Sequence, residues 1–419
     1  MDGDGRTHVV IIGAGFGGLA CARRLGNAPV KVTVIDRRNY HLFVPLLYQV
    51  ATAALSPGDI AQPVRRLLSR YANVNVVRGD VSGIDLGRRQ VVLADRTIPF
   101  DRLVLATGST YSYFRHDEWA EAAPGPKNLE NARTIRSRLL IAFEKAEICP
   151  DPAEQAVLLT TVIVGGGPTG VEMAGAVAEL TRHSLRRDFR HIDPTKARIL
   201  LIEAGPRILA GFSPDLSDYA KRALEKFGVT VVLGRPVENI EPGVVTIGGV
   251  SVRAGCIVWG AGVQASPAAR WLGVEGDRNG RIVTAPDLSV PGRAGIFAIG
   301  DTAAVTGVDG QPLPALAQVA HQEGLFLGRA LRANLADGKP IPPFTFHSRG
   351  NTAVIGRNAA VFEIGRWKIR GWLGWVMWAI VHIYLLTGFD KRFLVASQWL
   401  WRYVTYQSGV RLISESDDD

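Results

Sequence analysis

Cysteine is scarce in this chain, with three residues among 419. Cys21, Cys149 and Cys256 lie far apart and form neither a CxxC nor a CxxxxC pair. This spacing excludes a redox disulfide between sequence neighbours and a cysteine-based metal site of standard spacing. So few cysteines are typical of a protein that works in a reducing compartment.

Long apolar runs and targeting segments are also missing. The longest nearly uncharged apolar run, residues 372–386, holds about 15 residues, whereas a membrane-spanning helix needs roughly 20. A predicted strand begins within the first ten residues, so we expect neither a signal peptide nor a transit peptide. The formal net charge is +9. Because no Lys/Arg-rich run or nucleic-acid-binding signature accompanies it, this charge favours anionic cofactors or an anionic membrane over nucleic acid.

Glycine, by contrast, is abundant, and the first glycine-rich turn organises the chain. A β-branched run over residues 9–12 leads into Gly13, Gly15 and Gly18, a helical segment follows, and a second apolar run ends on Asp36. Gly13 permits a tight turn, Gly15 lets the backbone approach a pyrophosphate, and Gly18 lets the helix pack on the strand. The helix N-terminus favours phosphate, and Asp36 can accept hydrogen bonds from a ribose. This unit predicts a dinucleotide site, with FAD as the usual occupant so near the start of a long chain.

A second fingerprint has three glycines at the same spacing: Gly165, Gly167 and Gly170. The strand predicted after its helix ends on Glu203, 38 residues after Gly165, whereas the usual spacing is about 20. The excess is a polar, basic insert over residues 181–196, read as an extension of the helix and its loop. Two such units predict two dinucleotides. Glu203 favours the ribose 2′-OH of NADH over the 2′-phosphate of NADPH, and the nearby Arg207 weakens that preference.

Other apolar runs end on residues that suit contact with a ligand. The run that ends on Thr107 and Gly108 resembles the one that ends on Gly262, and in both the backbone can approach a ligand. A third run ends on Gly300 and Asp301. Such an aspartate typically meets a ribityl hydroxyl of a flavin; the alternative is a simple acid at a strand end.

The remaining pattern predicts an α/β fold with two Rossmann-like domains. We expect a helix over residues 129–147, short strands over 74–77 and 91–93, and a loop with short helices over 39–65 near the first site. Residues 314–324 open a further helix. Helical spacing places Gln318 on the same face as His321 and Gln322.

Aromatic and basic residues gather at the C-terminal end. Six of the nine tryptophans lie there: Trp367, Trp372, Trp375, Trp378, Trp399 and Trp401. Seven Lys/Arg and one acid, Asp390, lie between residues 366 and 411. Two short apolar helical stretches, 372–386 and 393–406, with this composition suit the headgroup interface of a bilayer. The alternatives are a buried helical hairpin and a dimer interface.

Taken together, these motifs make the chain similar to the type II NADH dehydrogenases, single-subunit flavoprotein NADH:quinone oxidoreductases that do not pump protons. The resemblance covers nearly the whole chain. It rests on GAGFGG, HLFVPLLYQVATAALSPGDIA, GGGPTGVEMAG, AGVQASP, AIGD, ALAQVAHQEG and the C-terminal aromatic helices.

The resemblance implies one non-covalent FAD per chain, with NADH as substrate. It implies a discontinuous FAD domain (residues 1–112 and 290–345), an NADH domain (113–289) and a C-terminal membrane-associating domain (346–419). Gly300 and Asp301 would then return to the site that begins at Gly13. The enzyme would be monotopic on the cytoplasmic face of the plasma membrane, and quinone would enter between the C-terminal helices and the flavin. A homodimer through the tail is left open.

The resemblance also assigns roles to single residues. Glu172, just past Gly170, would handle protons or contact the nicotinamide and flavin; the alternative is an acid stabilised at a helix N-terminus. Gln318 and Gln322 would lie beside the quinone headgroup; the alternative is that they hydrogen-bond polar groups at the start of the helix. His321 is a candidate proton donor. Four residues of the tail would meet quinone or membrane: Lys391 and Arg392 near the tunnel mouth, or in lipid contact, with Trp375 and Trp378.

The implied activity is non-electrogenic: hydride passes from NADH to FAD, and quinone then takes two electrons and two protons. Two rivals stay open. A sulfide:quinone oxidoreductase would need a cysteine pair at the flavin, which the sequence does not show. A low-turnover flavoprotein that senses NADH differs in class, and steady quinone-dependent NADH oxidation would separate it from the enzyme.

Overall fold

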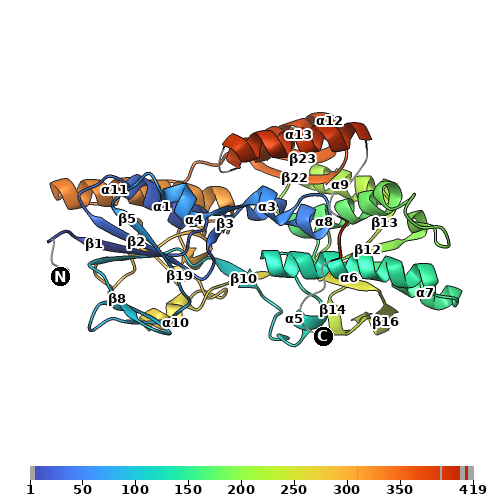
Figure 1. Ribbon diagram of the computed structural model, residues 1–419, viewed down its shortest axis with the longest axis horizontal. Helices are drawn as coiled ribbons and strands as arrows, with labels where there is room; N and C mark the ends of the chain where they lie inside the picture. The colour runs from blue at the N-terminus through green and yellow to red at the C-terminus, as the bar shows by residue number, and fades with distance from the viewer. Residues whose placement is uncertain (1–4, 309, 387–388, 406–410, 414–419) are drawn as a thin grey trace. The chain divides into compact units, whose positions relative to one another are not determined.

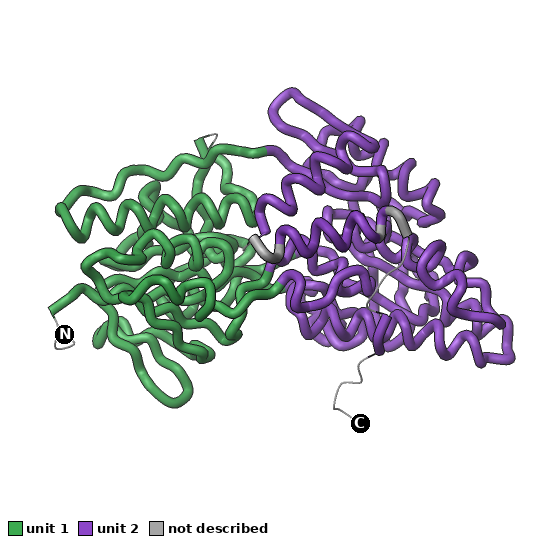
Figure 2. Tube along the Cα trace, turned by 45° about the horizontal axis from the view of Figure 1, so that its top comes forward, with its two compact units in different colours: residues 1–42, 61–110, 263–349 green, residues 43–60, 111–262, 350–419 purple. Residues whose placement is uncertain are grey.

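The computed structural model (Figure 1) describes residues 5–308, 310–386, 389–405 and 411–413. The chain divides into two compact units, each built from segments far apart in the sequence (Figure 2). Unit 1 comprises residues 1–42, 61–110 and 263–349, and unit 2 comprises residues 43–60, 111–262 and 350–419.

Unit 1 is built on a parallel sheet whose strand order is β20-β9-β1-β2-β5. The strands are β1 (His8–Ile12), β2 (Lys31–Asp36), β5 (Val74–Arg78), β9 (Arg102–Leu105) and β20 (Ile296–Ala298). Every residue of β1 is buried, because helices cover parallel sheets on both faces and near-continuous β-branched runs suit such strands. Helix α1 (Phe16–Leu25) connects β1 to β2, and α11 (Ala317–Asp337) packs against α1.

Smaller elements surround this sheet. They are β3 (Tyr40–Leu42), β4 (Ala61–Pro63), α4 (Val64–Leu68), β6 (Val81–Asp85), β7 (Gln90–Leu93), β8 (Thr97–Pro99), β10 (Ser109–Tyr111), β18 (Val263–Ala265), α10 (Ala268–Leu272), β19 (Ile282–Val283), η4 (Gly300–Thr302) and β21 (Ala303–Ala304). Strands β6, β7 and β8 form an antiparallel meander. The strands expected over 74–77 and 91–93 are confirmed as β5 and part of β7.

Unit 2 repeats the same plan with the sheet order β13-β12-β11-β17. Its parallel strands are β11 (Thr160–Val164), β12 (Arg198–Glu203), β13 (Val229–Leu233) and β17 (Cys256–Trp259). Helix α8 (Pro168–Glu179) follows β11 and continues into a π-helical turn, η2 (Leu180–Ser184). The expected extension of the helix at the start of the basic insert is therefore confirmed.

The other elements of unit 2 include the long helix α6 (Leu129–Ile148), which confirms the helix expected over 129–147. The rest are η1 (Val44–Leu46), α2 (Leu47–Ala51), α3 (Pro57–Ile60), α5 (Trp119–Ala122), α7 (Pro152–Leu158), η3 (Pro194–Lys196), α9 (Pro214–Lys226), β14 (Val237–Glu241), β15 (Val244–Ile247) and β16 (Val250–Arg253).

The C-terminal part of unit 2 is a small antiparallel sheet followed by two helices. The strands are β22 (Asn351–Gly356), β23 (Ala359–Ile364) and β24 (Trp367–Arg370), and the helices are α12 (Gly371–Leu385) and α13 (Phe389–Thr405). Strand β22 packs on α8, and α12 packs on β23. Two apolar helices were expected here and are confirmed. Within the described chain, none of the helices combines the length and apolar character that a membrane crossing requires.

Candidate functional site

The glycine turn of unit 1 has the geometry that its sequence predicts. Gly13 has φ +105°, and a Cβ placed there would lie 2.1 Å from the carbonyl oxygen of Ala106. A Cβ on Gly18 would lie 1.8 Å from the carbonyl oxygen of Gly13, so only glycine lets the helix approach the strand. Gly15 caps the N-terminus of α1, and no atom lies within 4 Å of where its Cβ would be. The turn therefore presents backbone N–H groups to open space, as a phosphate site requires.

Asp36 lies at the end of β2, beside this turn. Its Oδ2 accepts the N–H of Ala14 at 2.7 Å, and its Oδ1 accepts the N–H of Arg38 at 2.8 Å. His41, which the sequence pattern did not single out, donates from Nδ1 to the carbonyl oxygen of Ala14 at 2.9 Å. The side chain is buried, and burial lowers its pKa to about 4, so the imidazole is neutral. The hydrogen bond from His41 thus helps to fix the backbone of the glycine turn at Ala14.

A second set of polar contacts joins the end of β9 to η4. The hydroxyl of Thr302 accepts the N–H of Gly108 at 2.7 Å and lies 3.0 Å from that of Thr107. The hydroxyl of Ser109 donates to Oδ2 of Asp301 at 2.5 Å. Because β9 and β20 are paired in the same sheet as β1, the predicted Thr-Gly and Gly-Asp ends lie at one edge of unit 1.

Glu323 supports this edge from α11 and was not found from sequence. Its side chain is 1% exposed, and Oε2 accepts the N–H of Gly300 at 2.5 Å. Burial, together with the nearby Asp301, raises the pKa of this carboxyl to about 8. No local pattern could have identified it, because its partner lies 23 residues away.

These features of unit 1 fit FAD. The open N-terminus of α1 suits a pyrophosphate, Asp36 suits a ribose, and Asp301 suits a ribityl hydroxyl. Gly108 adds a position with φ +71° where a Cβ would meet no atom within 4 Å, so the backbone is open to a ligand there as well.

The glycine turn of unit 2 matches the first one closely. Gly165 also has φ +105°, and a Cβ there would lie 2.7 Å from the backbone nitrogen of Ala261. A Cβ on Gly170 would lie 1.8 Å from the carbonyl oxygen of Gly165. Gly167 caps α8 and, like Gly15, has no atom within 4 Å of its Cβ position. A Cβ on Gly262 would meet the ring of Phe114 at 2.6 Å.

Glu203 occupies the place in unit 2 that Asp36 has in unit 1. Its Oε2 accepts the N–H of Gly166 at 2.6 Å, and its Oε1 accepts the N–H of Gly205 at 2.7 Å. Arg207 donates to the carbonyl oxygen of Ala210 at 2.9 Å. The longer spacing to the acid therefore does not disturb the geometry, since the insert leaves β12 beside β11.

The three polar residues at the start of α11 share a face, as expected. Gln322 forms two hydrogen bonds with the backbone of His347, donating to its carbonyl oxygen at 2.9 Å and accepting its N–H at 3.1 Å. Gln318 accepts the N–H of Arg349 at 3.0 Å. Both amides thus hold the strap over residues 347–349. Burial and nearby arginines lower the pKa of His321, which disfavours a cationic imidazole.

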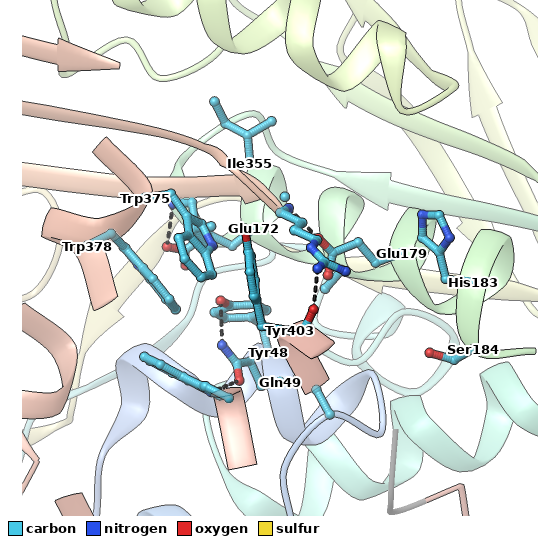
Figure 3. A pocket seen from close by; sticks show the side chains of 16 residues that line it. Tyr48, Gln49, Glu172, Glu179, His183, Ser184, Ile355, Trp375, Trp378 and Tyr403 are labelled. Carbon is cyan, nitrogen blue, oxygen red and sulfur yellow. Dashed lines mark hydrogen bonds between the residues drawn. The ribbon is translucent and has the colours of Figure 1, made fainter. Parts of the chain in front are cut away.

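Glu172 faces an aromatic cavity within unit 2 (Figure 3). It is 9% exposed, and its Oε1 accepts the N–H of Val354 at 3.4 Å. Burial raises the pKa of this carboxyl to about 8. The side chain therefore keeps a proton at neutral pH.

Most aromatic side chains that line the cavity come from α12 and α13, and Tyr48 comes from α2. Trp378 stacks on Trp399 with ring centroids 4.9 Å apart, and Trp375 packs on Tyr403 at 5.3 Å. The indole N–H of Trp399 donates to Oε1 of Gln49 at 3.0 Å. Gln49, from α2, was not found from sequence, because it meets its partner across 350 residues.

Of the two basic residues predicted near a tunnel mouth, the structure describes the side chain of Arg392 only. Arg392 donates from Nε to the carbonyl oxygen of Leu386 at 2.8 Å and lies 5.5 Å from the ring centroid of Tyr384. The side chain of Lys391 lies outside the described residues, so its predicted role is unchanged.

Comparison with known proteins gives consistent matches. A family model described as pyridine nucleotide-disulphide oxidoreductase matches residues 7–324. The type II NADH:quinone oxidoreductases Ndh and NdhA of Mycobacterium tuberculosis are 41% and 40% identical, over 98% and 94% of this chain and 91% and 87% of theirs. These relatives span nearly the whole chain.

Solved structures agree on the fold. The structure of NDH2 from Plasmodium falciparum in complex with NADH matches with a TM-score of 0.89 at 19% identity, covering 98% of this chain and 100% of that one. The sulfide:quinone oxidoreductase of Aquifex aeolicus matches with a TM-score of 0.70 at 18% identity, covering 92% and 91%.

Proposed function

This chain belongs to the type II NADH:quinone oxidoreductases, and we propose that it oxidises NADH and reduces a membrane quinone, with FAD as its bound cofactor. The observation that carries the proposal is the pair of matched glycine turns, each with a carboxylate held at the same place. One turn would hold FAD permanently, and the other would hold NADH for each turnover.

Bound FAD would accept two electrons from NADH and release them to quinone. Unit 1 would hold it through the N-terminus of α1, Asp36, the backbone at Gly108 and Asp301. The chain's own contribution is then positioning: the buried Glu323 and Thr302 fix the edge from which Asp301 projects. We keep the division into FAD, NADH and C-terminal membrane domains as part of this proposal.

In unit 2, Glu172 is our candidate for the group that gives a proton to the reduced quinone. Its carboxyl holds that proton at neutral pH, because burial raises its pKa to about 8. Trp375 and Trp378 line the same cavity and offer flat apolar surfaces that suit a quinone ring. Gln318 and Gln322 would act indirectly by fixing the strap over 347–349, and His321, which is held neutral, is a weaker candidate for proton transfer.

The C-terminal helices would seat the enzyme on the cytoplasmic face of the plasma membrane. Large apolar side chains are exposed along this region: Trp367, Trp372, Leu373, Ile380, Tyr384, Phe393, Leu400 and Trp401. Such side chains on short helices suit the headgroup boundary of a bilayer, and Arg392 and Lys391 would add electrostatic attraction. A homodimer that covers part of this surface is the competing proposal.

Sulfide oxidation is disfavoured by the cysteines. Cys21 and Cys256 are buried, and burial raises the pKa of each thiol to about 12, so neither forms a thiolate readily. The deciding experiment is NADH oxidation by FAD-loaded protein with and without a short-chain quinone, beside NADPH. Quinone-dependent turnover with NADH preferred is expected. Flavin reduction without quinone turnover would move the function to another acceptor, and no flavin reduction would refute the second nucleotide site.

A further inference from the structure

The cavity beside Glu172 extends along α8 and η2. The residues of this wall that line the cavity are Glu172, Ala176, Glu179, His183 and Ser184. In an α-helix, residues four, seven and eleven positions apart lie on one face. The π-helical turn η2 continues this face past the end of α8 and brings His183 and Ser184 into the same wall. One row of titratable groups thus leads away from the buried carboxyl.

The exposure of the three groups rises along this row. Glu172 is 9% exposed, Glu179 is half-buried, and His183 is exposed at the outer end. Eleven residues at a rise of 1.5 Å give a path of roughly 16 Å between the first and last group. The row therefore connects the interior of unit 2 with solvent.

The opposite walls leave room for water between these groups. They are formed by β22, by Trp375 and Trp378 of α12, and by Tyr403 of α13 (Figure 3). Trp399 of α13 also lines the cavity. The cavity measures about 110 Å³, and a single water needs roughly 10–15 Å³ measured in the same way. The cavity that these three groups line can therefore hold several waters.

Electrostatics along the row suit proton transfer. The N–H of Arg357, in the turn that follows β22, donates to Oε1 of Glu179, and the guanidinium of Arg357 lies 4.2 Å from the ring centroid of Tyr403. His183 is faced by Arg357 and by Arg182 and Arg186 of its own segment. Partial desolvation of the ring and these three arginines lower the pKa of His183, so the imidazole is neutral at pH 7 and can accept one proton while it releases another.

We propose that Glu179 and His183 form the route by which solvent protons reach Glu172 after each transfer to quinone. The inference rests on the proposed function, in which Glu172 is the donor. When an O–H bond of Glu172 breaks and its proton moves to the reduced quinone, a carboxylate is left. A proton taken up at His183 passes through bridging water and Glu179 and restores the O–H bond. The electrons come from NADH, and the route carries protons only.

The test uses the full-length, FAD-loaded enzyme with NADH and a short-chain quinone, and follows each half-reaction by stopped flow. The variants are His183→Ala and Glu179→Gln; the glutamine keeps the acceptor for the N–H of Arg357. We expect flavin reduction by NADH to stay within about 2-fold of wild type. Reoxidation by quinone should slow about 10-fold, less than the roughly 100-fold or more that loss of a direct acid–base group costs, because both groups act through Glu172. Matched controls are His191→Ala and Glu225→Gln, which change the same residue types outside the cavity.

Chemical rescue separates a proton route from a structural role. Added imidazole should restore reoxidation in His183→Ala and leave Glu179→Gln unchanged, and the solvent deuterium isotope effect should rise in both variants. Lack of rescue, or reoxidation within 2-fold of wild type, refutes the route. If Glu172→Gln slows reoxidation while both route variants do not, the donor role stands and only the route fails. If all three variants react like wild type, the donor role fails as well.

Discussion

The two glycine turns of this chain share one backbone geometry and differ in the acid that completes them and in the elements that pack around them. Gly13 and Gly165 have the same φ of +105°, and Gly18 and Gly170 make the same close approach to a carbonyl oxygen. Each turn is completed by a carboxylate that accepts the first N–H after the leading glycine. The same geometry thus occurs twice in one chain, and it is the geometry that a backbone needs in order to approach a pyrophosphate.

The differences lie in the acid and in the supporting elements. Asp36 reaches the N–H of Ala14, whereas the longer Glu203 reaches that of Gly166. A Cβ at position 166 would lie 2.9 Å from the Cβ of Glu203, so the longer acid needs the glycine. In unit 1, polar groups on η4 and α11 hydrogen-bond to the backbone beside the glycine turn. In unit 2, α8 carries the protonated Glu172, which lines an aromatic cavity.

The strongest test of the comparison changes the same glycine in both turns. Gly18→Ala should yield protein with little bound FAD, because the new Cβ would lie 1.8 Å from the carbonyl oxygen of Gly13. Gly170→Ala should keep FAD but lose at least roughly 100-fold in flavin reduction by NADH, the scale expected when substrate positioning fails. Flavin content and anaerobic stopped flow measure both. Normal reduction by NADH in Gly170→Ala would mean that this turn does not bind the nucleotide.

Unit 2 differs from unit 1 if Glu172 donates a proton to the reduced quinone, and a substitution of this residue tests that role. Glu172→Gln should slow flavin reoxidation by quinone about 100-fold, as is typical for loss of a general acid, and leave reduction by NADH within about 3-fold. In the wild type, the donor form is the protonated one, so reoxidation should fall as pH rises through about 8. The glutamine variant should lack this fall. An unchanged pH profile in the variant would assign the titration to another group.

A smaller effect, on nucleotide binding, is expected from substituting Glu203, the acid that completes the turn of unit 2. Glu203→Gln should raise the KM for NADH about 10-fold. It should also reduce the preference for NADH over NADPH, because the neutral glutamine does not repel a 2′-phosphate. Asp36→Asn is the matched change in unit 1 and should affect FAD retention instead. Steady-state kinetics with both nucleotides measure the first effect. A KM for NADPH that does not improve relative to NADH would show that Glu203 is not the selector.

The sequence could predict both turns because their constraints are local. Gly13, Gly18 and Asp36 lie on one strand–helix–strand segment, so their spacing alone predicts the geometry of the turn. The helices of the C-terminal part and the cluster at the start of α11 were also predictable, since composition and helical periodicity are read within a few turns.

The surroundings of Glu172 could not be predicted in this way. Its carboxyl meets the N–H of Val354 across 182 residues, and Gln49 meets Trp399 across 350. Glu323 was missed for the same reason, because its partner Gly300 lies on another element. Burial that depends on such long-range packing leaves no periodic signal, and burial is what gives both carboxyls their unusual pKa.

A buried histidine in each unit donates a hydrogen bond to a backbone carbonyl oxygen. His41 donates from Nδ1 to the carbonyl oxygen of Ala14, and His382 donates from Nδ1 to that of Trp378. Burial lowers the pKa of each to about 4, from an ordinary value of 6.5. Since the unfolded chain binds these protons first, stability is fully present above pH 6.5 and falls as pH drops toward 4.

Each histidine should therefore cost about 2 kcal/mol of stability between pH 7 and pH 5, at about 1.4 kcal/mol per pH unit and proton. His382→Leu and His41→Leu should each lose less in melting temperature over this range than the wild type, by several degrees. Thermal unfolding at a series of pH values measures the slope, which separates the proton effect from the constant cost of the substitution. If only His382→Leu flattens the slope, unit 2 alone limits acid stability, and the two units differ in their response to acid as well as in their chemistry.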